Sequence, residues 1–415
     1  MKEDNYKWLK GFNYVPSNSR NDIEFWRDYD PAVIEREMGY ASRLGLNCAR
    51  PFLAYVVYKT GPEKFIKNVT HFVQTAFKNG IRTMPVVWDS CFSEKEPLIT
   101  ADSNEWFANP GTMYLGRQFR EEQYRYCDAL MEALRDEPGL LMWDVHNEPW
   151  VTSYYFNYQN EEKERHFNEI LEFVKDFTAY FRQHDSHPVT VGVENPERLN
   201  YVGELCDVLS FHDYSPAKKI MEERYDEALA FSKKLSKPVI CSETGCPARA
   251  NPYDIAIETA REKGVGFILW ELMIGKCFWG DRHGIVYPDG TIRDPATVAA
   301  LAGFYRRRDG GEKDYNLNTE SLIDKYTEKA AGWLENPASL YGEGLDIVTV
   351  MANLVESGSL VPLNELPTSR VLRLETSGEN REALKTLMQE WAQVLKADAD
   401  KKRSTVYSCL PLPGM

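Results

Sequence analysis

The stretch Leu141-Met-Trp-Asp-Val-His-Asn-Glu-Pro-Trp150 decides how the rest of this chain is interpreted. It opens as an apolar run, which predicts a buried β-strand. Polar side chains follow abruptly at His146-Asn147-Glu148, and Pro149 ends the strand because proline has no backbone N–H to donate. A carboxylate at the mouth of a buried strand is costly unless it is paired or used. Glu148 is therefore either an ordinary solvated strand end or a functional group.

A second stretch, Lys237-Pro-Val-Ile-Cys-Ser-Glu-Thr-Gly245, has the same design. A short apolar strand ends in Glu243, and Gly245 permits the turn into the next element. Two strands would thus each deliver a glutamate at their carboxyl end. Glycoside hydrolysis needs two facing carboxyl groups, one to protonate the leaving oxygen and one to attack the anomeric carbon or to activate water.

The pattern of strands and helices predicts the fold. Strand-like stretches are expected at 9–15, 46–52, 81–89, 141–150, 188–194, 206–214, 237–245 and 265–272, and helices at 30–45, 62–80, 115–136, 161–184, 217–235, 254–263 and 295–308. Eight strands that alternate with helical segments indicate the α/β class and a (β/α)8 TIM barrel. A doubly wound open sheet is the competing fold, but it usually carries a glycine-rich phosphate turn after its first strand, and this sequence has none there.

In a (β/α)8 barrel the carboxyl ends of all strands lie on one face, where active sites are found. Polar and aromatic residues stand near the carboxyl ends of the predicted strands. The barrel would bring together Arg50, Trp88, Asp89, Asn147, Glu148, His212, Tyr214, Glu243 and Trp270. A gathering of this kind indicates an active site rather than ordinary strand ends.

On these residues the chain resembles the clan A glycoside hydrolases, most of all the family 5 cellulases and mannanases. The resemblance covers residues 8–308 and rests on Asn147-Glu148-Pro149, Glu243, His212-x-Tyr214, Arg50 and Trp270, in barrel order. It implies a retaining β-glycosidase in which Glu148 is the general acid and then the base, and Glu243 is the nucleophile. It implies a carbohydrate partner, and no cofactor, because acid–base and covalent catalysis need none.

The resemblance also implies supporting roles. Arg50 and Tyr214 would give Glu243 a positive charge and a hydrogen bond, either of which lowers its pKa. Asn147 would hold the sugar 2-hydroxyl group, and His212 would bond the sugar or orient Glu148. Trp270 would offer the sugar ring a flat apolar face. Further candidate stacking platforms are Trp88, Trp106, Trp150 and Trp279.

One departure concerns the end of the third strand, which reads Val87-Trp88-Asp89-Ser90. Many family 5 enzymes carry a histidine there, so the resemblance does not assign the residues that contact the sugar on this side. A β-linked glucan or mannan is the expected substrate, with xylan as a further candidate. The alternatives are an exo-acting β-mannosidase or β-galactosidase of the same clan, and a catalytically silent glycan-binding barrel.

Each supporting residue also has a plainer interpretation. Arg50 would serve as the partner of any strand-end acid, His212 as a satisfied core histidine, and Trp270 as core. A metal site made by His146, Glu148, His212 and Glu243 is a further alternative. The spacing of those four residues fits no ligand motif carried on one helix, although strand ends can still converge. No metal is therefore expected.

Composition narrows the class of partner. The 415 residues carry a net charge of -14, which argues against nucleic acid, since a phosphate-binding surface needs clustered Lys and Arg. No apolar run approaches the roughly 18 residues that a spanning helix needs, so no membrane partner is expected. Residues 1–10 hold no apolar signal core, which predicts a cytoplasmic protein, or a secreted or periplasmic one whose signal has been removed. The eight cysteines form no CxxC pair and indicate free buried thiols rather than a zinc site.

The character of the chain changes beyond residue 308. Leu322, Tyr326, Ala330 and Trp333 follow helical spacing, as do several apolar residues between 384 and 395. The sequence therefore predicts a catalytic barrel at 1–308 and a mostly helical C-terminal extension at 309–415. Neither the role of this extension nor the oligomeric state can be inferred from its pattern.

Overall fold

The computed structural model describes residues 6–91, 99–100, 108–277, 280 and 282–305, together with Lys329, Thr386, Gln389, Glu390 and Gln393. The chain divides into two compact units, Met1–Leu301 and Ala302–Met415. The residues described beyond position 308 are helical, as predicted. Most of the extension lies outside the described residues, so the domain boundaries 1–308 and 309–415 stay a prediction.

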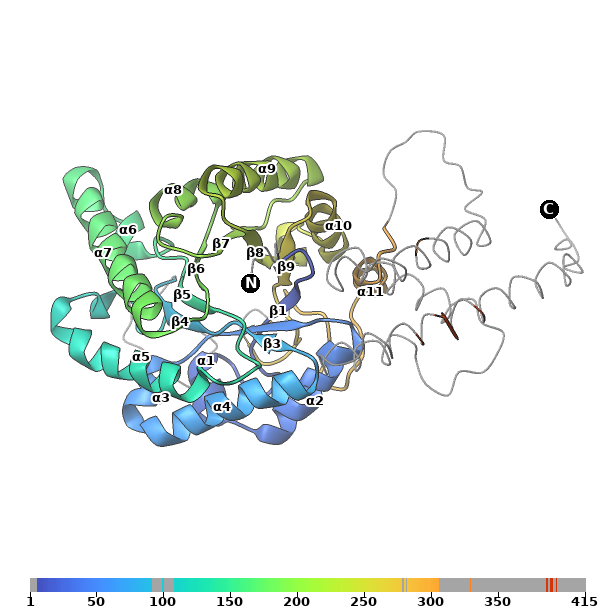
Figure 1. Cartoon of the computed structure of the whole chain (residues 1–415), viewed down its shortest axis with the longest axis horizontal. Helices are drawn as coiled ribbons and strands as arrows, with labels where there is room; N and C mark the ends of the chain where they lie inside the picture. Colours follow the sequence, from blue (N-terminus) through green and yellow to red (C-terminus); the bar gives the residue numbers. More distant parts are fainter. Residues whose placement is uncertain are drawn as a thin grey trace, which may run out of the picture. The chain divides into compact units, whose positions relative to one another are not determined.

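Parallel strands form the centre of the first unit (Figure 1). They follow one another across the sheet in the order β3-β2-β1-β9-β8-β7-β6-β5-β4. Their bounds are β1 Lys10–Tyr14, β2 Cys48–Pro51, β3 Arg82–Thr83, β4 Val86–Asp89, β5 Trp143–Asn147, β6 Val189–Val193, β7 Leu209–Asp213, β8 Val239–Thr244 and β9 Gly266–Leu269. All residues of these strands except Arg82 are buried, which is typical of a parallel sheet covered on both faces.

Strands β3 and β4 are two parts of one barrel strand. The sequence predicts a continuous strand at 81–89, but the ladder breaks at Met84-Pro85 because Pro85 has no N–H to donate. The pairing with β2 continues past the break, since the N–H of Leu53 donates to the carbonyl oxygen of Val86 at 2.9 Å. Strand β4 then pairs with β5. The nine strands therefore make eight positions around a closed barrel, which confirms the predicted fold.

Helices surround the strands in Figure 1. They are α1 Asp22–Arg27, α2 Pro31–Arg43, α3 Tyr55–Thr60, α4 Pro62–Lys78, α5 Arg120–Leu134, α6 Ser153–Phe156, α7 Asn160–His184, α8 Leu199–Val202, α9 Lys218–Leu235, α10 Tyr253–Lys263 and α11 Pro295–Leu301. Helix α2 begins as its sequence predicts, because the Asp30 side chain accepts a hydrogen bond from the N–H of Ala32, and Pro31 occupies the first position. Between β6 and β7 the crossover is short and carries α8 alone besides a 3-10 turn.

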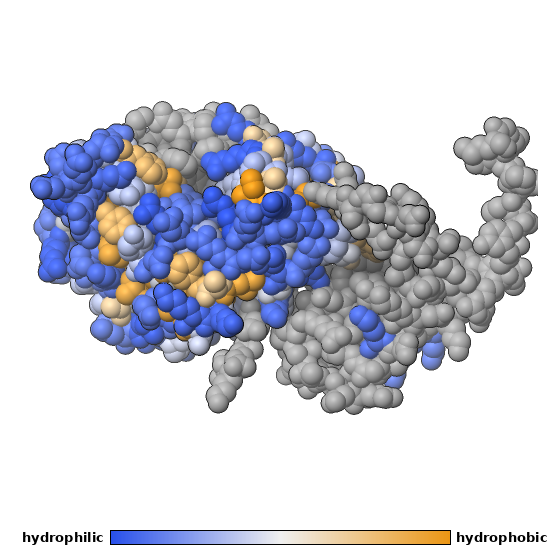
Figure 2. Space-filling model, turned by 90° about the horizontal axis from the view of Figure 1, so that it is seen from above, coloured by the Kyte–Doolittle hydropathy of each residue, from blue (hydrophilic) through white to orange (hydrophobic). Residues whose placement is uncertain are grey.

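The outer surface of the barrel unit is mostly polar. Figure 2 shows a largely hydrophilic face with small, separate apolar patches. The large hydrophobic side chains that are exposed come from different elements: Met113, Phe156, Tyr201, Ile220, Tyr287 and Phe304. In the part of the chain that the structure describes, no helix has the length and apolar character needed to span a bilayer.

Tyr253 connects three segments at the carboxyl end of the barrel. Its hydroxyl donates to the carbonyl oxygen of Trp270 at 2.7 Å and accepts from the N–H of Gly284 at 2.7 Å. Its ring also fills the space beside Gly245, where an added Cβ would lie 2.3 Å from the ring. Gly245 has φ +88, a conformation that glycine adopts readily. Tyr253 thereby fixes the ends of β8 and β9 relative to the segment that follows them.

We expect Tyr253→Phe to lower the free energy of unfolding by about 1–3 kcal/mol, because two buried backbone groups lose their partner. Chemical denaturation of the purified protein measures this loss. The matched control is Tyr287→Phe, since Tyr287 is 40% exposed. Its effect should stay within about 0.5 kcal/mol. Equal effects of the two variants would contradict the bridging role of the Tyr253 hydroxyl.

Candidate active site

Arg50 lies at the centre of a buried polar network inside the barrel. Its side chain is fully buried. The guanidinium donates to Asp144 Oδ2 at 2.8 Å, to Asn13 Oδ1 and Glu243 Oε1 at 2.7 Å each, and to Asn147 Oδ1 at 2.8 Å. These partners come from β5, β1 and β8. One cation therefore joins strands from opposite parts of the sheet, through charge-assisted bonds that are stronger than neutral ones.

Gly192 in β6 provides the space that this network occupies. A Cβ at this position would lie 2.9 Å from His212 Nε2 and 3.0 Å from Arg50 Nη2. The N–H of Gly192 also donates to Asp144 Oδ1 at 3.1 Å, so both oxygens of Asp144 are used. A larger residue here would displace His212 and Arg50, the two residues that contact the glutamates.

Glu243, near the end of β8, is held at both carboxylate oxygens. Arg50 contacts Oε1, and the Tyr214 hydroxyl donates to Oε2 at 3.0 Å. Burial raises the pKa of the Glu243 carboxyl, while His212 and Arg50 lower it. The sequence predicts a lowered pKa, and Arg50 acts in the predicted direction. The net shift is nevertheless upward, because removing the carboxylate from water outweighs the two neighbouring groups.

Glu148 directly follows β5 and has a strained backbone. Its φ is +39, which is uncommon for any residue other than glycine and is found at functional sites. A hydrogen bond of 2.6 Å joins its Oε1 to His212 Nδ1, and the thiol of Cys91 donates to its Oε2 at 3.0 Å. Burial raises the pKa of the Glu148 carboxyl above its usual value. Burial lowers the pKa of His212 to about 4, so this imidazole is neutral at pH 7.

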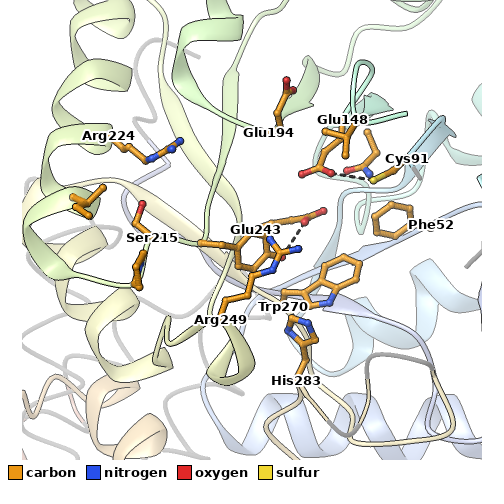
Figure 3. Close-up of a pocket in the computed structure, with 15 residues that line it drawn as sticks. Phe52, Cys91, Glu148, Glu194, Ser215, Arg224, Glu243, Arg249, Trp270 and His283 are labelled. Carbon is orange, nitrogen blue, oxygen red and sulfur yellow. Dashed lines mark hydrogen bonds between the residues drawn. The ribbon is translucent and has the colours of Figure 1, made fainter. Parts of the chain in front are cut away.

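Glu148, Glu243 and His212 meet at one point. One carboxylate oxygen of each glutamate and one ring nitrogen of His212 all lie within 4.8 Å of one another. Figure 3 shows the two carboxyl groups facing each other across the pocket. Such a cluster has the donor atoms of a metal site, but Arg50 places a fixed positive charge 2.7 Å from Glu243, which opposes a second cation. His146, the fourth residue of the metal site considered from the sequence, is not part of this cluster and is hydrogen-bonded to Ser90.

A pocket of about 570 Å³ opens above this pair. Five of the predicted site residues are among those that line it: Asn147, Glu148, Tyr214, Glu243 and Trp270. Trp270 packs edge-on against Phe52, with ring centroids 5.7 Å apart, and the two rings give the pocket an apolar wall. In Figure 3 this wall lies beside Glu243, with His283 next to Trp270.

Three other predicted residues lie behind the lining. Arg50 and His212 are buried and contact the glutamates directly. Asp89 accepts a hydrogen bond from the Asn147 side chain at 3.1 Å and from the N–H of Cys91 at 2.9 Å. Asp89 therefore supports two pocket residues without reaching the pocket itself.

Trp88 does not enter the pocket, although the sequence suggests that it does. It is fully buried, and its ring contacts Tyr126 and Phe177 of the surrounding helices. Side chains alternate along a strand, so Trp88 faces the helices while Asp89 faces the polar network. Trp150 is likewise buried, stacked on Phe167. Trp106 and Trp279 lie outside the described residues.

Several residues that contribute to the site are not among those that the sequence predicts. Asp144 had a recognisable signal, because a carboxylate inside an apolar strand requires a buried partner. Cys91 had no such signal in the sequence, since a buried thiol is usually inert. Arg249 lies on a loop whose position depends on the folded barrel. Asn13, in the first strand, became visible as a partner of Arg50 only in the folded chain.

No protein-family model and no curated protein sequence matches the chain. Solved structures do match it. The exo-β-1,4-mannosidase Op5Man5 from Opitutaceae bacterium strain TAV5 is 15% identical with a TM-score of 0.52, over 87% of this chain and 78% of that chain. The endo-1,4-β-mannanase from Rhizomucor miehei is 14% identical with a TM-score of 0.51, over 71% and 92%. A GH5_18 protein from Streptomyces cattleya, in complex with Manβ1-4GlcNAc, is 17% identical with a TM-score of 0.52, over 72% and 81%.

At these identities the similarity concerns the fold. The chain has the same kind of barrel as these structures, which agrees with the resemblance to family 5 glycoside hydrolases that the sequence indicates.

We expect Asp144→Asn to lower the free energy of unfolding by about 3–5 kcal/mol, because it removes the anion that neutralises a buried guanidinium. Urea denaturation measures the loss. The control is Asp226→Asn, which removes an ion pair of 2.6 Å to Lys263 at a 61% exposed side chain. That change should cost less than about 1 kcal/mol. Similar losses of unfolding free energy at both positions would show that the buried pair of Arg50 and Asp144 stabilises the fold no more than an exposed pair does.

Proposed function

We propose that this protein is a retaining β-glycoside hydrolase. Its first candidate substrates are β-linked mannosides, and its second are β-linked glucans. The observation that carries the proposal is the pair of buried glutamates, with carboxylate oxygens within 4.8 Å of each other at the floor of a pocket. Retaining glycosidases place their two carboxyl groups about 5–5.5 Å apart, and inverting ones leave room for a water at about 6.5–9.5 Å. The close spacing favours retention.

The partners of the two glutamates assign the roles. Glu243 contacts the permanently charged Arg50, whereas Glu148 contacts neutral His212 and the Cys91 thiol. A proton shared between two close carboxyl groups resides on the one without a cation, which is Glu148. Glu148 then protonates the leaving oxygen while Glu243 attacks the anomeric carbon. In the second step Glu148 takes a proton from water, which releases the sugar from Glu243.

The pocket walls suit a sugar ring. Trp270 and Phe52 provide an apolar face, and Asn147 presents its amide at the lining while Arg50 and Asp89 hold it from behind. The choice of mannosides is supported by the similar structures, one an exo-β-1,4-mannosidase and one an endo-1,4-β-mannanase.

The test is hydrolysis of β-1,4-linked mannan, glucan and xylan oligosaccharides and of aryl β-mannosides and β-galactosides. We expect Glu148→Gln to lower kcat by roughly 10²–10⁴-fold on natural linkages. Glu243→Gln should lose at least as much, because the covalent intermediate can no longer form. NMR of the first product should show the β-anomer, which is the sign of retention.

The matched control is Glu258→Gln, since Glu258 is a buried glutamate of α10 paired with Lys218 outside the pocket. It should keep wild-type kcat. A first product in the α-anomer would overturn the retaining mechanism. A folded wild-type protein that hydrolyses no member of the panel would overturn the enzymatic proposal, and a glycan array would then test a binding barrel.

The contact of Cys91 with Glu148 generates a pH prediction. A thiol that donates to the carboxylate stabilises its charged form, which lowers the pKa of Glu148 against the larger effect of burial. The alkaline limb of kcat/KM reports loss of the proton from Glu148. We therefore expect Cys91→Ala to raise this pKa and move the alkaline limb to higher pH. Cys91→Ser keeps a hydrogen-bond donor, so its alkaline limb should lie between those of the wild type and Cys91→Ala.

The control for this measurement is Cys206→Ala, because Cys206 is also buried but does not line the pocket. Its pH profile should match that of the wild type. If Cys91→Ala lowers the rate without moving the alkaline limb, the thiol fills space and does not tune Glu148.

A further inference from the structure

Arg249 lines the pocket without an ion-pair partner among the described residues. Its side chain lines the pocket, and its guanidinium carbon lies 4.8 Å from the centre of the Tyr214 ring, whose hydroxyl donates to Glu243. Among the described residues, no carboxylate lies within 4.0 Å of this guanidinium. Figure 3 shows Arg249 beside Glu243 at the pocket wall. A positive charge therefore stands one aromatic ring away from the proposed nucleophile.

The loop that carries Arg249 is held firmly. Cys246 and Asn251 exchange two backbone hydrogen bonds of 2.7 and 3.0 Å across the turn. The Asn251 side chain accepts from the N–H of Gly245 at 2.6 Å and donates to the carbonyl oxygen of Ser215 at 2.7 Å. The loop after β8 is thus tied to the loop after β7. The backbone position of Arg249 is set before any ligand arrives, which reduces the entropy lost on binding.

A second arginine, Arg224 of α9, lines the same pocket. Its side chain is 40% exposed, and its nearest acid is Asp213, whose Oδ1 lies 3.8 Å from Arg224 Nε. That oxygen already accepts from the hydroxyl of Ser215 at 2.5 Å. The contact between Asp213 and Arg224 is therefore weak, and the Arg224 guanidinium retains N–H groups that can donate to a ligand. In Figure 3 Arg224 points toward the pocket from the helix side.

The acids that line the pocket are hydrogen-bonded to other residues than these two arginines. Glu194 is bonded to Arg198 at 2.7 Å, and Glu243 is bonded to Arg50. Glu148 is bonded to His212 and Cys91. The nearby charge of Arg249 lowers the pKa of Glu148, against the larger effect of burial, without direct contact. Like charges in one pocket repel each other unless an anion comes between them. In a chain with a net charge of -14, two incompletely paired arginines in one pocket form a local positive site. Guanidinium groups bind carboxylate, phosphate and sulfate through paired hydrogen bonds.

We propose that Arg224 and Arg249 form a subsite for an acidic group on the sugar substrate, either a uronic acid carboxylate or a phosphate or sulfate ester. The inference rests on the proposed function insofar as it concerns a substrate, but the anion site itself does not require catalysis. The net charge of the chain disfavours a polyanion, so the subsite takes one acidic group on an otherwise neutral glycan.

The test is calorimetric titration of the wild-type protein with free sugars, which needs no turnover. The series is mannose, mannuronate, mannose 6-phosphate and mannose 6-sulfate, with the matching gluco sugars. We expect at least one acidic sugar to bind tighter than its neutral parent by roughly tenfold or more, the strength of charge-assisted hydrogen bonds. The member with the highest affinity distinguishes a carboxylate from an ester.

Arg249→Gln and Arg224→Gln should each remove most of this preference, and Arg249→Lys should keep part of it. Arg125→Gln, at an exposed residue of α5 that pairs with Glu121, should bind all sugars as the wild type does. Circular dichroism checks that each variant is folded. Equal affinity for acidic and neutral sugars, or a preference that survives both glutamine variants, would overturn the subsite.

Kinetics separate this outcome from the proposed function. If the protein hydrolyses aryl glycosides, the acidic sugars should inhibit competitively, and the glutamine variants should weaken that inhibition. Non-competitive inhibition would place the anion outside the pocket and overturn the proposal. If no glycoside is hydrolysed, the enzymatic function fails while the titrations still decide the subsite.

Discussion

The guanidinium of Arg50 is a positive charge removed from water, and the site is arranged around the need to neutralise it. Asp144 and Glu243 supply negative charge, while Asn13 and Asn147 supply polar oxygens. A buried cation that lost these partners would cost several kcal/mol, so the strands that carry them must keep their register. The same contacts fix Glu243 beside a permanent charge. The constraint that holds the barrel interior together therefore also makes the two glutamates unequal.

That inequality links stability to chemistry. Burial raises the pKa of both carboxyl groups, so it does not by itself distinguish the acid from the nucleophile. Arg50 acts on Glu243 through direct contact, and Glu148 has a neutral imidazole and a thiol instead. Two residues of the same type thus receive different protonation preferences from their surroundings. Helix α9 and the loop after β8 add a separate element, because they bring Arg224 and Arg249 to the pocket without joining the buried network.

Much of the fold and part of the site follow from local patterns. Eight apolar strands, the Asp30-Pro31 helix start and the glutamates at strand ends are visible in the sequence, because burial, capping and strand termination act over a few residues. The prediction of a continuous strand at 81–89 was wrong in detail, since Pro85 interrupts the ladder. Trp88 was assigned to the wrong face, because a strand end does not show which of two neighbouring side chains points inward. Cys91 and Arg249 escaped detection because their positions depend on loops.

The sequence by itself determined the alternation of strands and helices and the strand ends that carry polar groups, since each is encoded by hydrophobic periodicity within a short stretch. Only the tertiary structure decided which of those groups touch. Arg50 and Glu243 are far apart in the chain and meet at 2.7 Å only because the barrel closes. Burial, which sets the direction of the pKa shifts of Glu148, Glu243 and His212, is likewise a property of the assembled barrel. Desolvation and Coulomb energy depend on distances in space, and local sequence patterns do not contain those distances.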